Sequence, residues 1–354
     1  MSPLPDADPD ETVSWPDVLS SLIGGRDLSS RQAGWAMHQI LAGEATPAQI
    51  AGFAVALRAK GETVDEVEGL VATMYDFATP MTFDRRAVDI VGTGGDRSHT
   101  VNISTMAALV TAGAGVPVVK HGNRAASSSC GSADVLEHLG VRLDLSPTQV
   151  EDVANRVGIT FCFAPVFHAA LRHSAAPRRE LGVATTFNFL GPLANPARPA
   201  ALAVGVADQR MAPLIAGVLA KRAVDGFVFR GDDGLDELTT TTTSKVWSIA
   251  GGLVVEDQLD PAALGIARSH PDDLKGGDVE FNSHVALQLV AGEAGPVRDA
   301  VLLNAAAGIA AYEATEGSLT DRLTAGYQRA SAALDSGAVQ AKLTAWVAAV
   351  AAFE

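Results

Sequence analysis

The sequence contains very little cysteine, and this excludes two common ways of stabilising a fold. Only Cys130 and Cys162 occur among the 354 residues. Two cysteines are too few for a disulfide framework, and their spacing is not that of a metal site. Because a free cysteine is among the most often buried residue types, we expect both to be small buried thiols.

Long apolar runs and a basic N-terminus are missing as well. No stretch reaches the roughly 18 apolar residues that a membrane-spanning helix requires. Residues 1–11 carry four acidic side chains and no basic one, whereas a secretory leader begins with basic residues. We therefore expect a cytoplasmic protein that does not contact membranes and that starts with a disordered acidic tail over residues 1–13.

Basic residues are in the minority. The chain has 26 Lys and Arg against 41 Asp and Glu, a net charge of −15. Proteins that bind nucleic acid usually carry a basic surface, so the charge disfavours nucleic acid as a partner. Residues 86–180 differ from the rest, because their nine basic and eight acidic side chains give a net charge of +1. The overall acidity therefore does not exclude a local anion site in this segment.

The spacing of apolar residues divides the chain into two regions, in line with the two domains that its length suggests. Residues 16–79 read as helices, with start signals at Ser30, at Thr46-Pro47 and in the capping-box pattern of Thr63 and Glu66. From residue 87 onwards short β-branched runs alternate with helical segments, as in a parallel α/β sheet. We expect a tail over 1–13, a small helical domain over 14–83, joined by a helical segment near 178–200, and an α/β domain over 84–354.

Within the α/β domain, the pattern predicts individual elements. Strands are expected over 87–91, 116–119, 159–163, 201–206, 223–229 and 246–249, and the five threonines of 239–243 favour extended structure. Helices are expected over 104–112, 132–139, 146–157, 211–222, 283–291 and 298–315, with one more near the C-terminus.

A glycine-rich segment, residues 92–96 (GTGGD), follows the first expected strand and leads toward a helix. Glycines there allow close approach of the backbone to a ligand, and successive N–H groups before a helix form an anion cradle. Two known phosphate motifs do not fit, because Arg97 replaces the third glycine of the dinucleotide pattern and no Gly-Lys-Ser/Thr follows. Ser104 and Thr105 are candidates both to cap the next helix and to face a phosphate. A purely structural turn is the alternative.

A basic segment, residues 120–128 (KHGNRAASS), follows the second expected strand as a loop. Lys120 and Arg124 suit phosphate oxygens, the Arg through its bidentate fork. A solvated charged loop is the alternative. Since two neighbouring strands carry such loops, we expect a ligand crevice at the carboxyl edge of the sheet.

An acidic segment, residues 232–237 (DDGLDE), follows the fifth expected strand. Asp236 and Glu237 are candidate ligands for Mg²⁺, which takes one or two carboxylates together with substrate phosphates. A solvated acidic turn is the alternative. Arg178 is a candidate partner for a substrate carboxylate or, alternatively, forms a surface ion pair with Glu180. No Ser-His-Asp or Cys-His constellation can be argued.

Taken together, these segments resemble the anthranilate phosphoribosyltransferase family. The resemblance covers roughly residues 16–350, with its motifs in order. It is carried by 92–96 (GTGGD), 102–105 (NIST), 120–128 (KHGNRAASS), 131–136 (GSADVL), 178–182 (RRELG), 187–193 (FNFLGPL) with Asn195 and Pro196, 234–237 (GLDE), 276–278 (GGD) and 302–304 (LLN).

The resemblance implies transfer of phosphoribosyl from phosphoribosyl pyrophosphate to anthranilate, a step of tryptophan biosynthesis. It implies a small helical domain and a larger α/β domain of the nucleoside phosphorylase/phosphoribosyltransferase-like type, with substrates between them, and a homodimer formed through the helical domain. It also implies Mg²⁺, in two ions of which one arrives with the diphosphate. Two alternatives are a pyrimidine nucleoside phosphorylase, whose Lys-Met-Ser-Gly-Arg loop is absent, and a nucleic-acid-binding relative, which would show a basic groove.

Carried over residue by residue, the family's site gives Lys120, Asn123 and Arg178 as catalytic residues and Ser104, Asp236 and Glu237 as Mg²⁺ ligands. Acceptor contacts are expected from Gly92, Asn123 and Arg178, with His121 lining the acceptor channel. The substrate-binding set is Gly92, Gly95, Asp96, Thr100, Asn102, Ser104, Thr105, Lys120, His121, Gly122, Asn123, Arg124, Ala125, Ala126, Ser127, Ser128, Ser132 and Arg178. Ser129, Ala169 and Ala184 depart from the family pattern, which leaves the fine positioning of the acceptor open.

Overall fold

The computed structural model describes residues 13–125 and 129–353, and the chain divides into two compact units. A helical unit contains the chain up to Phe77 together with residues 170–187, and an α/β unit contains residues 78–169 and those from Asn188 onward. The polypeptide therefore passes from one unit to the other three times. The acidic tail expected over 1–13 lies outside the described residues, apart from Val13.

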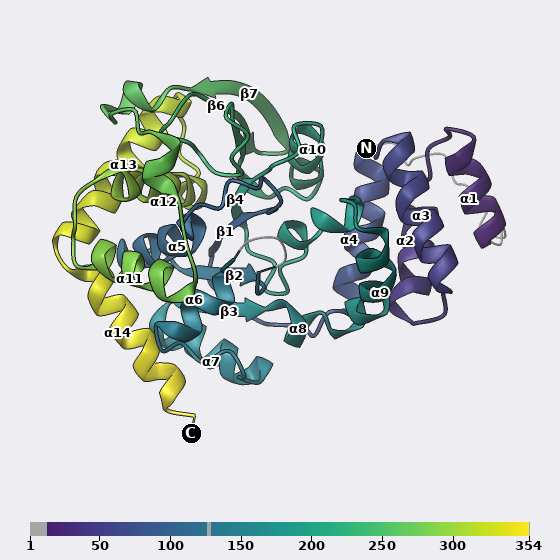
Figure 1. Ribbon diagram of the computed structural model, residues 1–354, viewed down its shortest axis with the longest axis horizontal. Coiled ribbons are helices and arrows are strands. Elements are labelled where there is room, and N and C mark those ends of the chain that lie inside the picture. Colours follow the sequence, from purple (N-terminus) through teal and green to yellow (C-terminus); the bar gives the residue numbers. More distant parts are fainter. Residues whose placement is uncertain (1–12, 126–128, 354) are drawn as a thin grey trace. The chain divides into compact units, whose positions relative to one another are not determined.

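The helical unit is built from helices whose starts are fixed by side chains. They are α1 (Trp15–Ile23), α2 (Ser30–Leu41), α3 (Pro47–Lys60), α4 (Val64–Phe77) and α9 (Arg172–Leu181) (Figure 1). Thr46 caps α3 and Thr63 caps α4, as expected from the sequence. The expectation that Ser30 caps α2 is wrong, because Ser29 accepts the hydrogen bond from the Gln32 N–H and Ser30 is the first helical residue.

Two buried glutamates hold the helical unit together. Glu66 accepts hydrogen bonds from the Leu28 N–H at 2.8 Å and from Lys60 Nζ at 2.9 Å. Thr186 Oγ1 donates to Glu62 Oε1 at 2.6 Å. The bond from Thr186 to Glu62 ties residues 170–187 to helices that precede them by more than a hundred residues. Helix α9 itself packs on α3 and α2.

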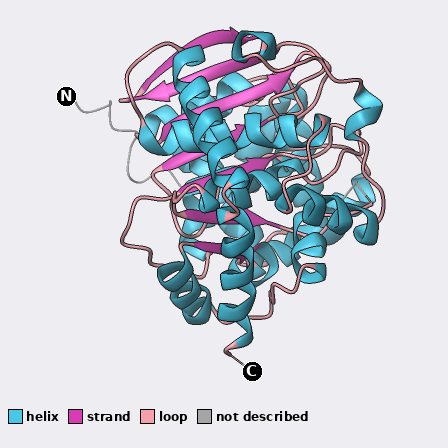
Figure 2. Cartoon of the chain, turned by 90° about the vertical axis from the view of Figure 1, so that its left-hand side faces the viewer, coloured by secondary structure: helices cyan, strands magenta, loops and turns pink. Residues whose placement is uncertain are grey.

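Among the described residues, seven strands form a single sheet in the α/β unit, in the order β3-β2-β1-β4-β5-β6-β7. Neighbours from β3 to β5 pair in parallel, and β6 and β7 add antiparallel pairs at one edge, so the expected mostly parallel sheet is confirmed. The strands are β1 (Val88–Gly92), β2 (Val118–Gly122), β3 (Ile159–Phe163), β4 (Ala201–Gly205), β5 (Asp225–Gly231), β6 (Ser244–Ala250) and β7 (Leu253–Leu259) (Figure 2).

Helices cover the parallel strands, which are buried along most of their length. The helices are α5 (Ile103–Gly113), α6 (Ser132–His138), α7 (Pro147–Val157), α8 (Ala164–Phe167), α10 (Ala212–Lys221), α11 (Val279–Val290), α12 (Pro296–Glu313), α13 (Leu319–Asp335) and α14 (Ala338–Ala351). Two helices follow residue 315 where the sequence suggested one. None of the helices in the described ranges is long and apolar enough to cross a bilayer.

The five threonines of 239–243 do not form the extended segment that their composition suggested. Their hydroxyls instead bond to the acidic turn before them. Thr239 Oγ1 donates to Asp233 Oδ2 at 2.7 Å, Thr241 bonds the same carboxylate, and Thr243 bonds Asp232. Local side-chain bonds of this kind compete with a sheet ladder, and they fold this segment into a loop.

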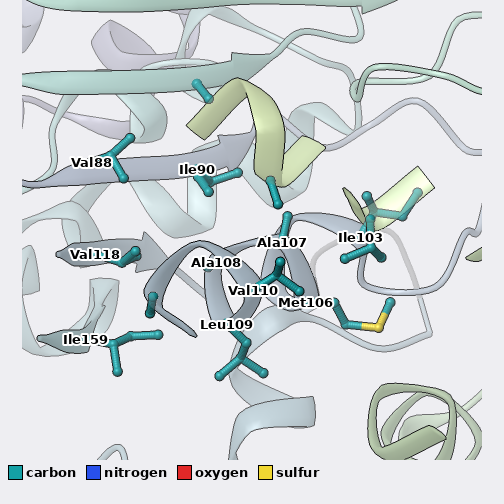
Figure 3. Packing of buried hydrophobic residues seen from close by; sticks show 14 of the residues in the cluster. Val88, Ile90, Ile103, Met106, Ala107, Ala108, Leu109, Val110, Val118 and Ile159 are labelled. Atoms are coloured by element: carbon teal, nitrogen blue, oxygen red, sulfur yellow. The ribbon is translucent and has the colours of Figure 1, made fainter. Parts of the chain in front are cut away.

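In the core of the α/β unit, α5 and α12 pack on the central strands. Side chains of β1, β2 and β3, including Val88, Ile90, Val118 and Ile159, lie beside those of α5 (Figure 3). On α12, a Cβ at Gly308 would lie 2.4 Å from Ile90 Cδ1, so a larger residue there would require the Ile90 side chain to move. Such dense packing fixes the carboxyl ends of β1 and β2, from which the candidate site is built. Cys130 and Cys162 are both buried thiols, as expected.

Candidate active site

A cavity of about 290 Å³ lies at the carboxyl ends of β1 and β2 in the α/β unit. It gathers residues from the glycine-rich, basic and acidic segments, which are far apart in the sequence. Of the predicted site residues, those that line it are Gly92, Gly95, Asp96, Thr100, Asn102, Ser104, Lys120, His121, Gly122, Asn123, Arg124, Ala125, Ser132, Asp236 and Glu237.

The other predicted residues lie elsewhere. Thr105 is buried and does not line the cavity, and its hydroxyl has no hydrogen-bond partner among the described residues. Arg178 belongs to α9 in the helical unit, where its guanidinium lies 5.4 Å from the centre of the Phe187 ring and burial lowers its pKa. Ala126, Ser127 and Ser128 lie outside the described residues.

The glycine loop, residues 92–102, wraps around a carboxylate. Gly94 and Gly95 have φ values of +69° and +86°, which glycine adopts without strain. The Gly94 N–H donates to Asp236 Oδ2 at 2.7 Å. A Cβ at Gly92 would lie only 2.4 Å from the same oxygen. The missing side chain at Gly92 therefore permits the close approach of Asp236, and the Gly94 N–H joins the anion cradle to the acidic pair.

The first turn of α5 faces the second carboxylate. The Ser104 N–H donates to Glu237 Oε1 at 3.1 Å. The expectation that Ser104 and Thr105 cap the helix is wrong, because Asn102 occupies the cap position and both residues lie inside the first turn. Glu237 satisfies one of the unpaired N–H groups at this helix start, where its negative charge also suits the helix dipole.

The acidic segment separates into two halves with different surroundings. Asp232 and Asp233 form an exposed turn, while Asp236 and Glu237 are 9% and 7% exposed. Burial, followed by the nearby charge of Asp96, raises the pKa of Asp236 to about 7. Burial, followed by the charge of Asp236, raises the pKa of Glu237 well above its ordinary value. The solvated-turn alternative therefore describes only the first half of the segment.

The two buried carboxylates fit a divalent cation. Oxygen ligands suit Mg²⁺, which is typically held by one or two carboxylates and completes its shell with water and substrate phosphates. Among the described residues no group of three or more His, Cys, Asp or Glu forms a closed metal cage. The open pair formed by Asp236 and Glu237, beside the Ser104 hydroxyl, has the chemistry of a Mg²⁺ site shared with substrate.

Lys120 lies in β2, not in the loop predicted to follow that strand. The strand continues to Gly122 because Lys120, His121 and Gly122 pair with β3 in register. The Lys120 side chain is 2% exposed; its Nζ donates to the Ile90 carbonyl and, at 3.2 Å, to Ser104 Oγ. Burial lowers the pKa of Lys120, while the charges of Asp89 and Glu237 oppose that shift.

Asp89 is a residue that the sequence reasoning missed. It is fully buried in β1, accepts from Asn195 Nδ2 at 2.8 Å and from the His121 N–H at 3.2 Å, and burial raises its pKa to about 6. A carboxylate inside a β-branched run was the available signal, since an acidic residue is rarely fully buried without a partner. Asp89 supplies Lys120 with a counter-charge.

The imidazole of His121 is buried at the cavity wall. Its Nδ1 lies 3.1 Å from the Gly191 carbonyl, and its Nε2 has no partner among the described residues. Burial, and secondly the ring of His168 at 5.2 Å, lower the pKa of His121 to about 3. The ring is therefore neutral near pH 7.

Arg124 is already paired with acidic side chains of α6. Its guanidinium contacts Glu137 at 2.6 and 2.9 Å and Asp134 at 2.9 Å, and these bonds, Glu137 first, raise its pKa. The solvated-loop alternative thus describes Arg124 better than it describes Lys120. An incoming phosphate would have to compete with two carboxylates for this guanidinium.

Two family models together match most of the chain. Residues 84–340 match the model of the glycosyl transferase family, a/b domain, and residues 16–78 match that of the glycosyl transferase family, helical bundle domain. An anthranilate phosphoribosyltransferase of Nocardioides is 62% identical over 338 residues, covering 96% of this chain and 99% of the relative. That of Thermobifida fusca is 60% identical, covering 94% and 96%.

The chain belongs to the anthranilate phosphoribosyltransferase family.

Solved structures agree with this membership. The anthranilate phosphoribosyltransferase of Thermus thermophilus is 41% identical, with a TM-score of 0.88 over 94% of this chain and 99% of that one. The Saccharomyces cerevisiae enzyme, solved in complex with PRPP and Mg, is 24% identical, with a TM-score of 0.87 over 96% and 98%; at this identity it supports the fold alone. As a member of the anthranilate phosphoribosyltransferase family, the chain is a glycosyltransferase that transfers a phosphoribosyl group.

Proposed function

We propose that the cavity at the ends of β1 and β2 is where the transfer takes place, with phosphoribosyl pyrophosphate (PRPP) as donor and anthranilate as acceptor. The observation that carries this proposal is the bond between the Gly94 N–H and Asp236. Through it the anion cradle of the glycine loop and the buried carboxylate pair share one cavity. A diphosphate with its cation requires both at the same place.

The leaving group is the part of the reaction that these residues serve. The acceptor nitrogen bonds to C1 of the ribose while the bond from C1 to pyrophosphate breaks, and the nitrogen then loses a proton to water. Negative charge grows on the departing oxygens, and we assign Lys120 and the N–H groups of the glycine loop to stabilise it. Asp236, Glu237 and the Ser104 hydroxyl would hold Mg²⁺, which would supply further positive charge for the same oxygens. We propose two ions, one of them arriving with the diphosphate.

The acceptor needs positioning more than proton transfer. An aromatic amine is barely basic and needs no strong general base to release its proton once the new bond has formed. We assign Asn123 and Gly92 to the acceptor and Arg178 to its carboxylate, a positioning effect. His121 lines the acceptor channel as a neutral ring, in keeping with its pKa of about 3.

We further propose a cytoplasmic homodimer that forms through the helical unit. Two large apolar side chains on neighbouring helices support this: Ile23 at the end of α1 is 79% exposed, and Val55 on α3 is 44% exposed. Large exposed apolar side chains are candidates for a contact surface.

The reaction is tested by the loss of anthranilate fluorescence in the presence of PRPP and Mg²⁺. We expect consumption only when all three components are present, and chelation of Mg²⁺ by EDTA should stop it. Failure of folded protein to consume anthranilate would refute the proposal.

The cation site is tested with the double variant Asp236→Asn/Glu237→Gln. We expect activity to be lost or to require far more Mg²⁺ than the wild type requires. A Mg²⁺ dependence equal to that of the wild type would show that the cation binds elsewhere. The exposed turn offers a matched control, because Asp232→Asn changes a carboxylate of the same segment outside the cavity and should leave the Mg²⁺ dependence unchanged.

A further inference from the structure

A buried amide behind the cavity connects segments that no local structure joins. Asn282, in the first turn of α11, is 3% exposed. Its Nδ2 donates to Asn102 Oδ1 at 2.9 Å, and its Oδ1 accepts from the Gly277 N–H at 2.8 Å. Asn102 in turn donates through its Nδ2 to the Cys130 carbonyl at 3.2 Å. The two amides therefore form a relay from α11 through the glycine loop to the residues that precede α6.

Backbone hydrogen bonds between residues 274–276 and residues 99–101 also hold the second half of the glycine loop. The Gly276 N–H donates to the His99 carbonyl at 2.8 Å, and the Val101 N–H donates to the Leu274 carbonyl at 2.9 Å. A Cβ at Gly276 would lie 2.7 Å from the Thr100 carbonyl oxygen and 2.9 Å from Asn282 Oδ1. Asn282 thus completes a clasp, residues 274–277 with Asn282, that fits closely against the glycine loop.

The orientation of the Asn102 amide depends on this clasp. The oxygen of a side-chain amide only accepts hydrogen bonds, and its NH₂ group only donates them. Asn282 donates to the oxygen and the Cys130 carbonyl accepts from the nitrogen, so both ends of the Asn102 side chain are committed. Rotating the amide by 180° would place oxygen against oxygen at the Cys130 carbonyl.

We infer that Asn282 is a positioning residue for the donor substrate. It acts through Asn102, by holding the glycine loop and the start of α6 in the arrangement that the diphosphate of PRPP needs. This inference rests on the proposed function, which places the diphosphate in the cavity. Asn282 contacts neither substrate, but it bonds to Asn102 in the second half of the glycine loop, which the proposed function assigns to the diphosphate. We therefore expect its effect on the donor and not on the acceptor.

The test compares Asn282→Asp with wild type. Aspartate still accepts from Gly277 but cannot donate to Asn102. We expect KM for PRPP to rise by about tenfold or more, a size typical of misplaced binding groups, while KM for anthranilate stays within about twofold. The dissociation constant of Mg²⁺-pyrophosphate, measured by calorimetry, should rise in parallel. Ser283→Ala is the matched control, because Ser283 is its neighbour on α11 and its hydroxyl has no partner among the described residues; wild-type constants are expected.

A double-mutant cycle separates positioning from general destabilisation. If Asn282 acts through Asn102, then Asn282→Ala should weaken pyrophosphate binding in the wild-type background and have no further effect in an Asn102→Ala background. Asn282→Ser serves in the same cycle if the alanine variant does not fold. Independent, additive effects, or equal changes in KM for both substrates, would overturn the inference. If the wild type itself binds no pyrophosphate, the proposed function fails instead.

Discussion

At the residue scale, the buried carboxylates of Asp236 and Glu237 make the cation-free protein sensitive to pH. Burial raises the pKa of Asp236 from 3.8 to about 7. Between these values the folded protein binds more protons than the unfolded chain, so stability falls as pH rises through the window. Asp89, with a pKa raised to about 6, contributes with the same sign.

Asp236→Asn should therefore stabilise the protein in the absence of cations. In EDTA we expect its melting temperature to exceed that of the wild type at pH 8, with a smaller gain at pH 5, where the wild-type carboxyl is protonated. At about 1.4 kcal/mol per pKa unit the gain at pH 8 is on the order of 2–4 kcal/mol. Thermal denaturation at both pH values measures it. A loss at pH 8, or equal gains at both values, would contradict the raised pKa.

His121 makes the opposite contribution to stability and none to proton transfer. Burial lowers the pKa of His121 to about 3, so its stabilising effect is lost as pH falls from about 6.5 toward 3. We expect the pH profile of kcat to show no inflection near pH 6.5. We also expect His121→Asn to keep kcat within about tenfold of wild type, because the substitution removes a hydrogen-bonding ring but not a group that transfers protons. Steady-state kinetics from pH 6 to 9 decide this. Abolished turnover with both substrate affinities intact would make His121 a base.

Sequence reasoning was more successful with residue types than with their surroundings. It predicted Lys120, Asp236 and Glu237 from charge and position after strands, and all three line one cavity. It placed Lys120 in a loop, because a lysine inside a buried strand contradicts the usual burial of charge. Only the three-dimensional structure shows the compensating partners, Asp89 beside it and Ser104 across from it.

At the scale of elements, the loop between β5 and β6 depends on a side chain from α12. Asn304 is fully buried; its Oδ1 accepts from the Leu238 N–H and its Nδ2 donates to the Leu238 carbonyl, both at 2.9 Å. These two bonds satisfy the backbone N–H and carbonyl of Leu238, the residue after Glu237, as a neighbouring strand would. The position of the carboxylate pair is thus set by a helix more than sixty residues further along the chain.

Asn304→Leu should therefore both destabilise the fold and weaken Mg²⁺ binding. Two buried backbone groups would be left unpaired, at a cost of about 2–4 kcal/mol. Urea unfolding measures the cost, and a Mg²⁺ titration of activity should show a higher half-maximal concentration. Asn304→Asp keeps the acceptor for the Leu238 N–H, so its stability and its half-maximal Mg²⁺ concentration should lie between those of the leucine variant and the wild type. An unchanged Mg²⁺ titration in the leucine variant would mean that the loop holds its shape alone.

The elements that the sequence pattern predicted well are the buried parallel strands. Their β-branched runs have no competing helical spacing, and five of the expected strands overlap β1 to β5. Strand β7 was missed because its residues are exposed up to Leu259 and show no alternation. The threonines of 239–243 were misread because the hydrogen bonds of their hydroxyls to Asp232 and Asp233 depend on where the chain turns.

At the scale of the whole molecule, the proposed dimer should weaken when charged residues replace exposed apolar side chains of the helical unit. Size-exclusion chromatography with light scattering should give the mass of a dimer for the wild type. The double variant Ile23→Glu/Val55→Glu should shift the protein toward monomer, because an unpaired charge in an interface is costly to bury. Leu253→Glu, on the exposed edge strand β7, is the control and should leave the dimer intact. A monomeric wild type at micromolar concentration would contradict the proposal.

The three passages of the chain between the units determine the order in which the protein can be completed during synthesis. Domains usually fold in order as they leave the ribosome. Here the helical unit begins first, yet α9 and Thr186, which pack on α3 and bind Glu62, are translated only after β1, β2 and β3. A nascent chain that ends between α4 and α9 therefore carries four helices whose docking face for α9 is uncovered. The helical unit becomes complete only when part of the sheet is already present, and a gene fragment encoding it would need residues 170–187 joined to α4 by a linker.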